Sequence, residues 1–417
     1  MMGMRMRWVI GALMFLAGMI NYLDRSALGV AAPLIRTDLH LDPAQLGIVF
    51  SSFSFGYALF CFVGGYASDH YGPKRVLGVS MVLWSVFCGL TAAAWNLTSL
   101  LIIRILFGMG EGPIGSTFNK TVRNWFPHGQ QATAVSVANA GTPLGAAVSG
   151  PVVGLLALNF GWRVAFVIIT LIGIAWTIAW FAIATDHPSE SARVNAEELA
   201  EYEAGQKTQP VAGGMRKPLG EFLARPAVLA TAFAFFGYSC ILFFFLTWFP
   251  TYLVTYRHMD FIKAGFLASL PFLGAFVGVL CSGTLSDMMV RRGCSLSVAR
   301  KTPIIGGLAL STTIVGANFV QSPALIIAFL SLAFFANGLA SIHWSLVSAA
   351  APERLIGLTS GVFNAVGGLA GISGPIIIGW LLRGGDFTRP LTFIACVAAL
   401  GVCSYIFVVG KLERVRE

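Results

Sequence analysis

Long apolar runs separated by short polar segments follow one another along almost the whole chain. Charges or Pro/Gly turns bound twelve such runs, which span residues 8–32, 44–67, 76–94, 98–118, 131–157, 163–184, 227–254, 263–286, 302–318, 323–349, 357–381 and 391–410. A helix needs about 20 residues to cross the hydrocarbon core of a bilayer, where its backbone polar groups have to be bonded within the segment. The pattern therefore predicts an all-α membrane protein with twelve transmembrane helices.

The longest polar stretch, residues 185–226, divides the apolar runs into six and six. Its composition predicts a short solvated helix over residues 189–206, followed by a Pro/Gly-rich and basic linker. We therefore expect an N-terminal six-helix bundle over 1–184, a cytoplasmic connecting loop over 185–226 and a C-terminal six-helix bundle over 227–417.

Short motifs recur in the same order, at a nearly constant offset, in the two halves of the chain. Pro33 matches Pro250, Gly65 and Asp69 match Gly283 and Asp287, and Ser149-Gly150-Pro151 matches Ser373-Gly374-Pro375. The matches indicate two pseudo-symmetric six-helix bundles. Parallel repeats of this kind place a substrate site near the bilayer midplane, between the halves.

Charged residues are scarce and unevenly placed. Only 11% of the 417 residues are charged, against about 25% in a soluble domain, and the net charge is +9. Placing both termini in the cytoplasm leaves most Lys and Arg residues on that side, as the positive-inside rule requires. No basic helix or basic patch interleaved with aromatics predicts nucleic-acid binding. The seven cysteines show no ligand spacing, so we expect no metal and no cofactor.

Four strongly ionisable residues lie well inside predicted spans, where a central charge costs about 2.5–3.5 kcal/mol. Asp24 and Arg25 are in the first span, and Arg104 and Glu111 share one face of the fourth. Two internal ion pairs that lock helices together would explain them. However, apolar residues often stabilise a protein as well as a buried ion pair does. We therefore favour a role in binding an anion and moving protons.

The segment from Gly65 to Arg75, GYASDHYGPKR, resembles the signature between helices two and three of the major facilitator superfamily. Its glycines would allow a tight turn, and its charges resemble a cytoplasmic latch. A conformational latch is thereby expected at Gly65, Asp69, Gly72, Lys74 and Arg75. Pro73 departs from the pattern, because that position is often basic in the superfamily.

Three further segments together resemble the anion:cation symporter family, and its bacterial sugar-acid transporters most of all. They are NYLDRSALG (21–29), RILFGMGEGP (104–113) and FNAVGGLAGISGP (363–375). The resemblance covers nearly the whole chain. It implies the major facilitator fold and proton symport of a galactonate, glucarate or hexuronate type of anion by alternating access. It also implies a monomer in a bacterial inner membrane.

The resemblance implies similar roles at the matched positions, and their chemistry suits those roles. Arg25 offers a planar fork for a substrate carboxylate. Asp24 and Glu111 are candidate proton carriers, and Arg104 would set the protonation state of Glu111. Burial favours a neutral carboxyl group, whereas a neighbouring guanidinium favours its ionised form. A carboxyl group that loses its Arg partner to a substrate anion therefore changes its affinity for a proton.

The hydroxyl groups of a sugar acid also need hydrogen-bond donors and acceptors. Candidate substrate-binding residues are Tyr22, Tyr57 and Thr142 in the first half and Ser341, His343, Trp344, Ser345 and Asn364 in the second. Core packing is the alternative explanation for the tyrosines and for Thr142, and a satisfied core histidine is the alternative for His343. Asn364 lies within one of the three segments that carry the resemblance.

Other functions remain as alternatives to the sugar-acid symporter. The cargo could be an aromatic or dicarboxylic acid, and the carrier could be sodium-coupled or facilitative. A membrane receptor that binds an anion without moving it is a second class. An enzyme is disfavoured because no paired carboxylates, His cluster or nucleophile motif share a loop, and the lack of a Walker sequence argues against ATP-driven pumping.

Overall fold

A computed structural model describes residues 5–127, 130–206, 226–343 and 356–409. Within these ranges the regular elements are α-helices with short 3-10 and π segments, and none is a strand. Ten helical spans of the described chain, one of them Leu97–Trp125 made of α4 and α5 together, are long and apolar enough to cross a membrane, and the apolar part of α16, Ala365–Leu381, is shorter. The prediction of an all-α membrane protein is therefore confirmed.

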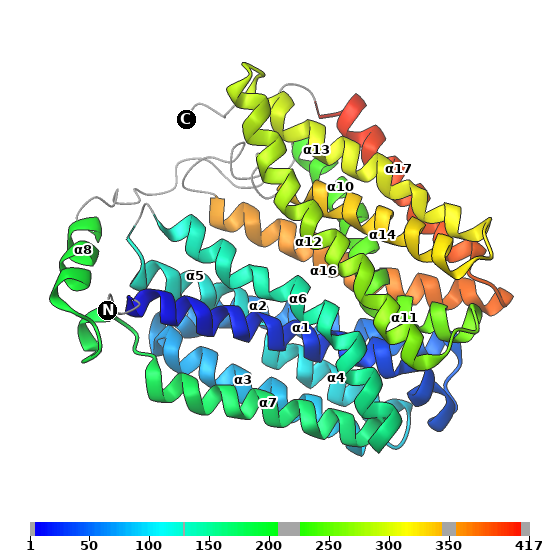
Figure 1. Ribbon diagram of the computed structural model, residues 1–417, viewed down its shortest axis with the longest axis horizontal. Coiled ribbons are helices and arrows are strands. Elements are labelled where there is room, and N and C mark those ends of the chain that lie inside the picture. Colours follow the sequence, from blue (N-terminus) through cyan, green and yellow to red (C-terminus); the bar gives the residue numbers. More distant parts are fainter. Residues whose placement is uncertain (1–4, 128–129, 207–225, 344–355, 410–417) are drawn as a thin grey trace. The chain divides into compact units, whose positions relative to one another are not determined.

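The first half of the chain contains α1 (Met6–Asp38), α2 (Pro43–Tyr71), α3 (Pro73–Leu90), α4 (Leu97–Glu111), α5 (Ile114–Trp125), α6 (Gln131–Phe160), α7 (Trp162–Ile183) and α8 (Ala196–Gln206) (Figure 1). The second half contains α10 (Pro226–Thr247), α11 (Phe249–Thr251), α12 (Phe261–Arg291), α13 (Leu296–Ser311), α14 (Pro323–Leu339), α16 (Ile356–Leu381) and α17 (Thr388–Phe407). The chain divides into two compact units, one of residues up to 41 and 52–211 and the other of residues 42–51 and 212 onward.

Two predicted helix boundaries differ from the structure. The fourth apolar run, expected to be continuous over 98–118, breaks after Glu111, and Pro113 precedes the new helix α5. Pro33, which we expected to end the first run, lies inside α1. A proline ends a helix less reliably inside a membrane, because neighbouring groups can satisfy the backbone that it frees.

Close approach between α1 and α6 explains two glycines of the first unit. A Cβ atom on Gly141 or Gly145 would lie 2.0 Å from the carbonyl oxygen of Phe15 or Met19, respectively. No side chain fits at that distance, so only glycine lets the two backbones meet. α6 therefore packs along α1 (Figure 1).

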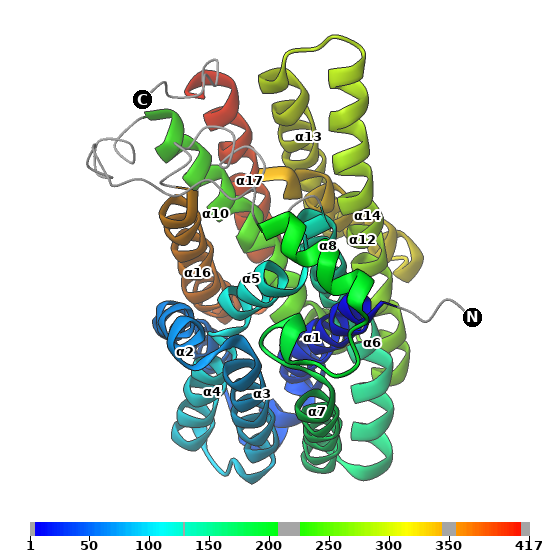
Figure 2. The same cartoon turned by 90° about the vertical axis from the view of Figure 1, so that its left-hand side faces the viewer.

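The helix packing repeats between the two units. In the first unit α1 packs on α6, and α3 packs on both α4 and α7. In the second unit α10 packs on α16, and α13 packs on both α14 and α17. These pairs are equivalent when the helices are counted within each half, and Figure 2 shows the pair of α3 and α7 from one end. The repeat supports the predicted pseudo-symmetry.

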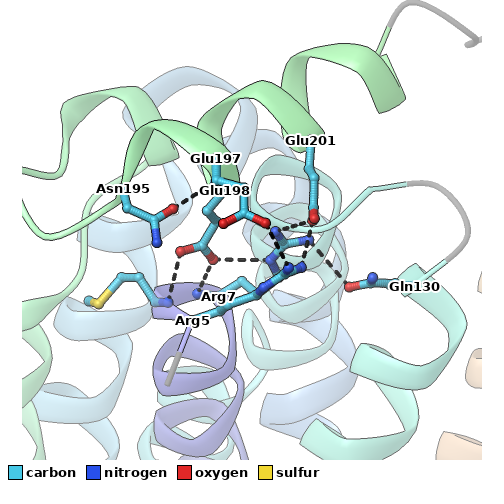
Figure 3. A network of polar contacts seen from close by, with 8 residues as sticks. Arg5, Arg7, Gln130, Asn195, Glu197, Glu198 and Glu201 are labelled. Carbon is cyan, nitrogen blue, oxygen red and sulfur yellow. Dashed lines mark hydrogen bonds and ion pairs between the residues drawn. The ribbon is translucent and has the colours of Figure 1, made fainter. Parts of the chain in front are cut away.

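A short connector helix, α8, docks on the start of α1 (Figure 3). The Glu198 carboxylate accepts hydrogen bonds from the backbone N–H groups of Met6 at 3.0 Å and Arg7 at 2.9 Å, and from Arg7 Nε at 3.0 Å. It thus satisfies two of the four N–H groups that a helix start leaves unpaired. The predicted helix over 189–206 is correct in its second part, since α8 begins after Asn195, whose side chain accepts from the Glu198 N–H.

Glu201, one turn along α8, completes this contact. Its carboxylate accepts from Arg7 Nη2 and Arg5 Nη1, both at 2.7 Å. The hydrogen bond from Arg7 and the charges of both arginines hold the pKa of Glu201 below its ordinary value. Arg7 also donates to Gln130 Oε1 at 3.4 Å, just ahead of α6. The connector is therefore anchored to the first unit through α8 (Figure 3).

Candidate functional site

The first unit brings Arg25 of α1 against Glu111, the last residue of α4. Arg25 Nη2 lies 2.7 Å and Nε 3.2 Å from the same Glu111 oxygen, Oε2. Glu111 is fully buried, whereas 11% of the Arg25 side chain is exposed. The other carboxylate oxygen, Oε1, has no hydrogen-bond partner among the described residues. One oxygen of the Glu111 carboxylate therefore lacks a hydrogen bond, and the Arg25 side chain is the more exposed member of the pair.

Aromatic rings surround the Arg25 guanidinium. Its Cζ lies 4.9 Å from the ring centroid of Tyr22, 4.7 Å from that of Phe53 and 5.0 Å from that of Tyr57. Ring faces attract a cation without giving it a competing anion. The aromatic cluster thus holds Arg25 in place while leaving Glu111 as its sole carboxylate partner in the described chain.

Asp24 and Arg104 are buried nearby without a direct partner. Asp24 is 0% and Arg104 2% exposed. Neither Asp24 oxygen has a hydrogen-bond partner in the described part of the chain, and the same holds for Nε and Nη1 of Arg104. Arg104 and Glu111 both lie within electrostatic range of Asp24. The cation of Arg104 rests instead on the rings of Phe53, at 5.4 Å, and Phe107, at 4.4 Å.

The structure therefore pairs the four ionisable residues differently from the sequence-based expectation. Arg104 is expected to set the protonation state of Glu111, and it lies within electrostatic range of it, but Arg25 is the residue in direct contact with Glu111. The alternative of two locked ion pairs is also not what is observed, because the contacts form only one. Arg25 belongs to α1 and Glu111 to α4, so the contact joins two helices, which spacing within one helix does not predict.

Three further predicted ligands belong to the first unit. Tyr22 and Tyr57 contact Arg25 as described. The Thr142 hydroxyl donates to the Asn139 carbonyl in its own helix at 2.8 Å. The Thr142 methyl group faces Gly18 of α1, since a Cβ added to Gly18 would lie 3.5 Å from it. Gly18 is on the same face of α1 as Tyr22 and Arg25. Thr142 therefore lies on the same side of α1 as Arg25, about two turns away.

The second unit contains the remaining predicted ligands. His343 is buried, and its ring centroid lies 5.8 Å from Phe235, 5.4 Å from Tyr238 and 5.8 Å from Tyr405. His343 Nδ1 is hydrogen-bonded to the Ala340 carbonyl, and Nε2 has no partner among the described residues. Ser341 is partly buried. Trp344 and Ser345 lie outside the described residues, and Asn364 is described only as part of the α16 backbone.

The predicted latch residues lie around the turn between α2 and α3. Gly72 has a φ of +81°, and a Cβ there would lie 2.5 Å from Asp186 Oδ2. Asp186 Oδ1 in turn accepts the backbone N–H of Lys74 at 2.8 Å, which caps the start of α3. Gly65 is not part of this turn, because α2 continues through it to Tyr71.

The charges of the latch also find partners that the motif alone did not indicate. Asp69 pairs with Lys120 Nζ of α5 at 2.6 Å rather than with Lys74 or Arg75. Arg75 is exposed. The latch motif is therefore tied to α5 by Asp69 and to the end of α7 by Asp186.

We expect Gly72→Ala to destabilise this turn by about 1–3 kcal/mol, because a Cβ would meet both an unfavourable φ and the Asp186 carboxylate. Thermal unfolding of the purified variant measures the effect. Gly65→Ala is the matched control, since its Cβ would meet only Ser116 Cβ at an ordinary 3.9 Å. Equal unfolding temperatures for the two variants would contradict the assignment.

Several residues of the site were not among the predicted ones. Phe53 lies against both buried arginines, Trp84 lies against Asp24, and Asp186 caps α3. Phe53 could have been predicted from the sequence, because it lies one helical turn before Tyr57 and so on the same face of α2. Apolar runs give no comparable signal for Trp84. No group of three or more described His, Cys, Asp or Glu residues is placed to hold a metal ion.

Membrane-length helices in two repeated units, with buried ionisable side chains in their interior, define a secondary membrane transporter. The chain belongs to the Major Facilitator Superfamily, whose sequence profile matches residues 14–375. The expectations of this fold and of a transporter rather than an enzyme are thus confirmed.

Relatives and solved structures agree with this assignment. The chain is 41% identical over 407 residues to the hexuronate transporter of Bacillus subtilis, covering 95% of this chain and 94% of that protein. It is 38% identical over 419 residues to a D-galactonate transporter of Escherichia coli, covering 99% and 97%. Among solved structures, a D-xylose–proton symporter shares the fold with a TM-score of 0.75 at 17% identity, covering 97% of this chain and 98% of that one.

Proposed function

We propose that this protein is a proton-coupled symporter that imports a sugar-acid anion of the galactonate, glucarate or hexuronate type by alternating access. The supporting observation is the contact between Arg25 and one oxygen of Glu111, the other oxygen being unpartnered. Relatives named as hexuronate and galactonate transporters support the class of cargo.

Arg25 is the proposed anchor for the substrate carboxylate. Its fork now uses Nε and Nη2 on a single oxygen, which is a poorer arrangement than two parallel bonds to two oxygens. A substrate carboxylate can offer both oxygens and so replace Glu111. The surrounding rings of Tyr22, Phe53 and Tyr57 keep the guanidinium in position during the exchange.

Glu111 and Asp24 are the proposed proton carriers, with Arg104 as the nearby cation that modulates them. When substrate takes Arg25, Glu111 loses its neutralising partner inside a buried site, and binding a proton becomes favourable. Neither oxygen of the buried Asp24 forms a hydrogen bond or ion pair with a described residue, so Asp24 is free to exchange a proton in this arrangement. Proton uptake and anion binding thus promote each other.

The hydroxyl groups of the sugar acid are proposed to be read from both halves. Tyr22, Tyr57 and Thr142 would contribute from the first half, and Ser341, His343, Trp344, Ser345 and Asn364 from the second. A carbonyl only accepts hydrogen bonds, so the contact with Ala340 puts the proton of His343 on Nδ1 and leaves Nε2 as an acceptor. That acceptor suits a hydroxyl donor.

We propose a monomer in a bacterial inner membrane with both termini in the cytoplasm. The docking of α8 on the start of α1 puts the connector and the N-terminus at the same end of the first unit. This supports an even number of spans between them. The bundles over 1–184 and 227–417, the loop over 185–226 and the latch at Gly65, Asp69, Gly72, Lys74 and Arg75 complete the proposal.

A thermal-shift screen of the purified protein against organic acids, followed by uptake into proteoliposomes, tests this function. We expect stabilisation by one or more sugar acids, and accumulation of that acid driven by an inwardly directed proton gradient. Aromatic and dicarboxylic acids and a sodium gradient are the comparison arms. Binding without exchange of labelled substrate would indicate a receptor instead.

We expect Glu111→Gln to abolish proton-driven accumulation, because the amide cannot take up a proton. The amide still accepts a hydrogen bond from Arg25, so the variant should fold and exchange labelled substrate. Uptake with and without a proton gradient measures both properties. Accumulation at the wild-type level would contradict the role of Glu111.

A further inference from the structure

An indole N–H and a carboxyl group lie unpaired beside each other in the core of the first unit. Trp84 of α3 and Asp24 of α1 are both 0% exposed. Trp84 Nε1 and both Asp24 oxygens lack a hydrogen-bond partner among the described residues. The two side chains are close enough to interact, but they do not meet the geometry of a hydrogen bond.

Trp84 differs in this respect from the other buried tryptophans of the described chain. Five indole N–H groups donate to an oxygen atom: those of Trp125 to Thr185, Trp162 to Asp38, Trp176 to Leu13, Trp180 to Lys74 and Trp248 to Pro375. Buried donors are nearly always satisfied, so the exception calls for a partner that comes and goes. An indole only donates, and an ionised carboxylate only accepts.

The position of Trp84 is fixed by helix packing. A Cβ on Gly110 of α4 would lie 2.9 Å from the backbone nitrogen and 3.2 Å from Cβ of Trp84. α3 and α4 therefore approach each other at this point. The indole is held on the side of α1 where Asp24 lies, and Cys88 follows one turn further along α3.

Few other ionisable groups can act on Asp24. Arg104 and Glu111 of α4 and Cys88 of α3 are within electrostatic range. Three other helices pack against α1, and of these α6 carries no ionisable side chain. The only charged residue of α7 is Arg163, which pairs with Asp38. On α5, Lys120 pairs with Asp69, and Arg123 lies in the last turn of the helix. On α1 itself, Arg25 faces Glu111 instead. Trp84 is therefore an uncharged donor that can respond directly to the state of Asp24.

We propose that Trp84 is a positioning residue for proton exchange at Asp24, and this rests on the proposed function. When the Asp24 O–H bond breaks and its proton passes to solvent, the indole N–H donates to the new carboxylate. When the proton returns, that hydrogen bond weakens, and the Trp84 N–H bond stays intact throughout. A hydrogen bond to an ionised acceptor is about twice as strong as a neutral one, so Trp84 favours the release of the proton.

The test is the pH dependence of substrate exchange in proteoliposomes at equal pH on both sides. Asp24 should keep its proton to a higher pH in Trp84→Phe, because the carboxylate has lost a donor. We expect the alkaline limb of exchange to move up by roughly one pH unit. Trp176→Phe is the matched control, since it removes an indole N–H from the Leu13 carbonyl, and its profile should match the wild type.

A double variant separates this role from a structural one. In an Asp24→Asn background, Trp84→Phe should leave the pH profile unchanged. An equal shift with and without Asp24, or the same shift in Trp176→Phe, would overturn the proposal. If wild-type protein shows no proton-driven uptake, the proposed function fails; if wild-type uptake is coupled but Trp84→Phe has the wild-type profile, only the role of Trp84 fails.

A spectroscopic measurement covers the case in which Trp84→Phe does not fold. Indole ¹⁵N–¹H resonances of tryptophan-labelled wild-type protein should include one, among the 10 tryptophans, that titrates with the alkaline limb of exchange. This titration should disappear in Asp24→Asn. If no indole resonance depends on Asp24, the inference is wrong.

Discussion

Replacing Arg25 by lysine is expected to reduce transport by about two orders of magnitude, although the positive charge is kept. A lysine offers one compact ammonium group, whereas the guanidinium can bind both oxygens of a carboxylate and stack on rings. Each hydrogen bond to a charged group contributes about 1.5–3 kcal/mol, and every 1.4 kcal/mol is tenfold in affinity. The contacts with Tyr22, Phe53 and Tyr57 would also weaken.

Initial uptake of the stabilising sugar acid, measured below saturation in proteoliposomes, reports this loss. Arg163→Lys is the matched control, because Arg163 pairs with Asp38 at 2.5 Å but 45% of its side chain is exposed. We expect that variant to stay within about twofold of the wild type, since surface pairs contribute little. Comparable uptake by Arg25→Lys and Arg163→Lys would rule out Arg25 as the carboxylate anchor.

Glu198→Ala is expected to produce the largest loss of stability, on the order of 3–5 kcal/mol. The side chains of Arg7 and Glu198 are only 1% and 5% exposed, so the substitution removes a buried charged partner from a buried arginine. It also removes the acceptor for the N–H groups of Met6 and Arg7 at the start of α1. The apparent unfolding temperature of the detergent-solubilised protein should fall by at least about 5 °C.

The neighbouring residue Glu197 provides the control for this experiment. Its side chain is 78% exposed and lies 3.7 Å from Arg5. Glu197→Ala should therefore change the free energy of unfolding by less than about 1 kcal/mol. Glu198→Gln should fall between the two alanine variants, because its amide oxygen still accepts hydrogen bonds but carries no charge. Equal unfolding temperatures for Glu197→Ala and Glu198→Ala would refute the anchoring role of α8.

The fold was largely predictable because membrane helices follow from local composition. A run of about 20 apolar residues has to be helical in a bilayer, whatever its neighbours are. The break at Pro113 and the continuation of α1 through Pro33 were not predictable in this way. Whether a proline ends a helix depends on which neighbouring groups satisfy the freed backbone, and these are brought there by packing.

The sequence by itself singled out four ionisable residues of the first unit. Asp24, Arg25, Arg104 and Glu111 stand out because a charge in an apolar span is costly wherever it lies. Only the tertiary structure decided how they are paired. Helical spacing placed Arg104 and Glu111 together, yet it is the approach of α1 to the end of α4 that brings Arg25 to the carboxylate.

The latch motif and Asp24 are likewise visible in the sequence, whereas the partners of the latch and the position of Trp84 beside Asp24 come from the packing of the helices. Asp69 and Gly72 are visible in the sequence, but Lys120 and Asp186 reach them from α5 and from the end of α7. Periodicity within one helix predicts which face of that helix a side chain occupies. It carries no information on which face of another helix will meet it, since that depends on how all the helices pack together.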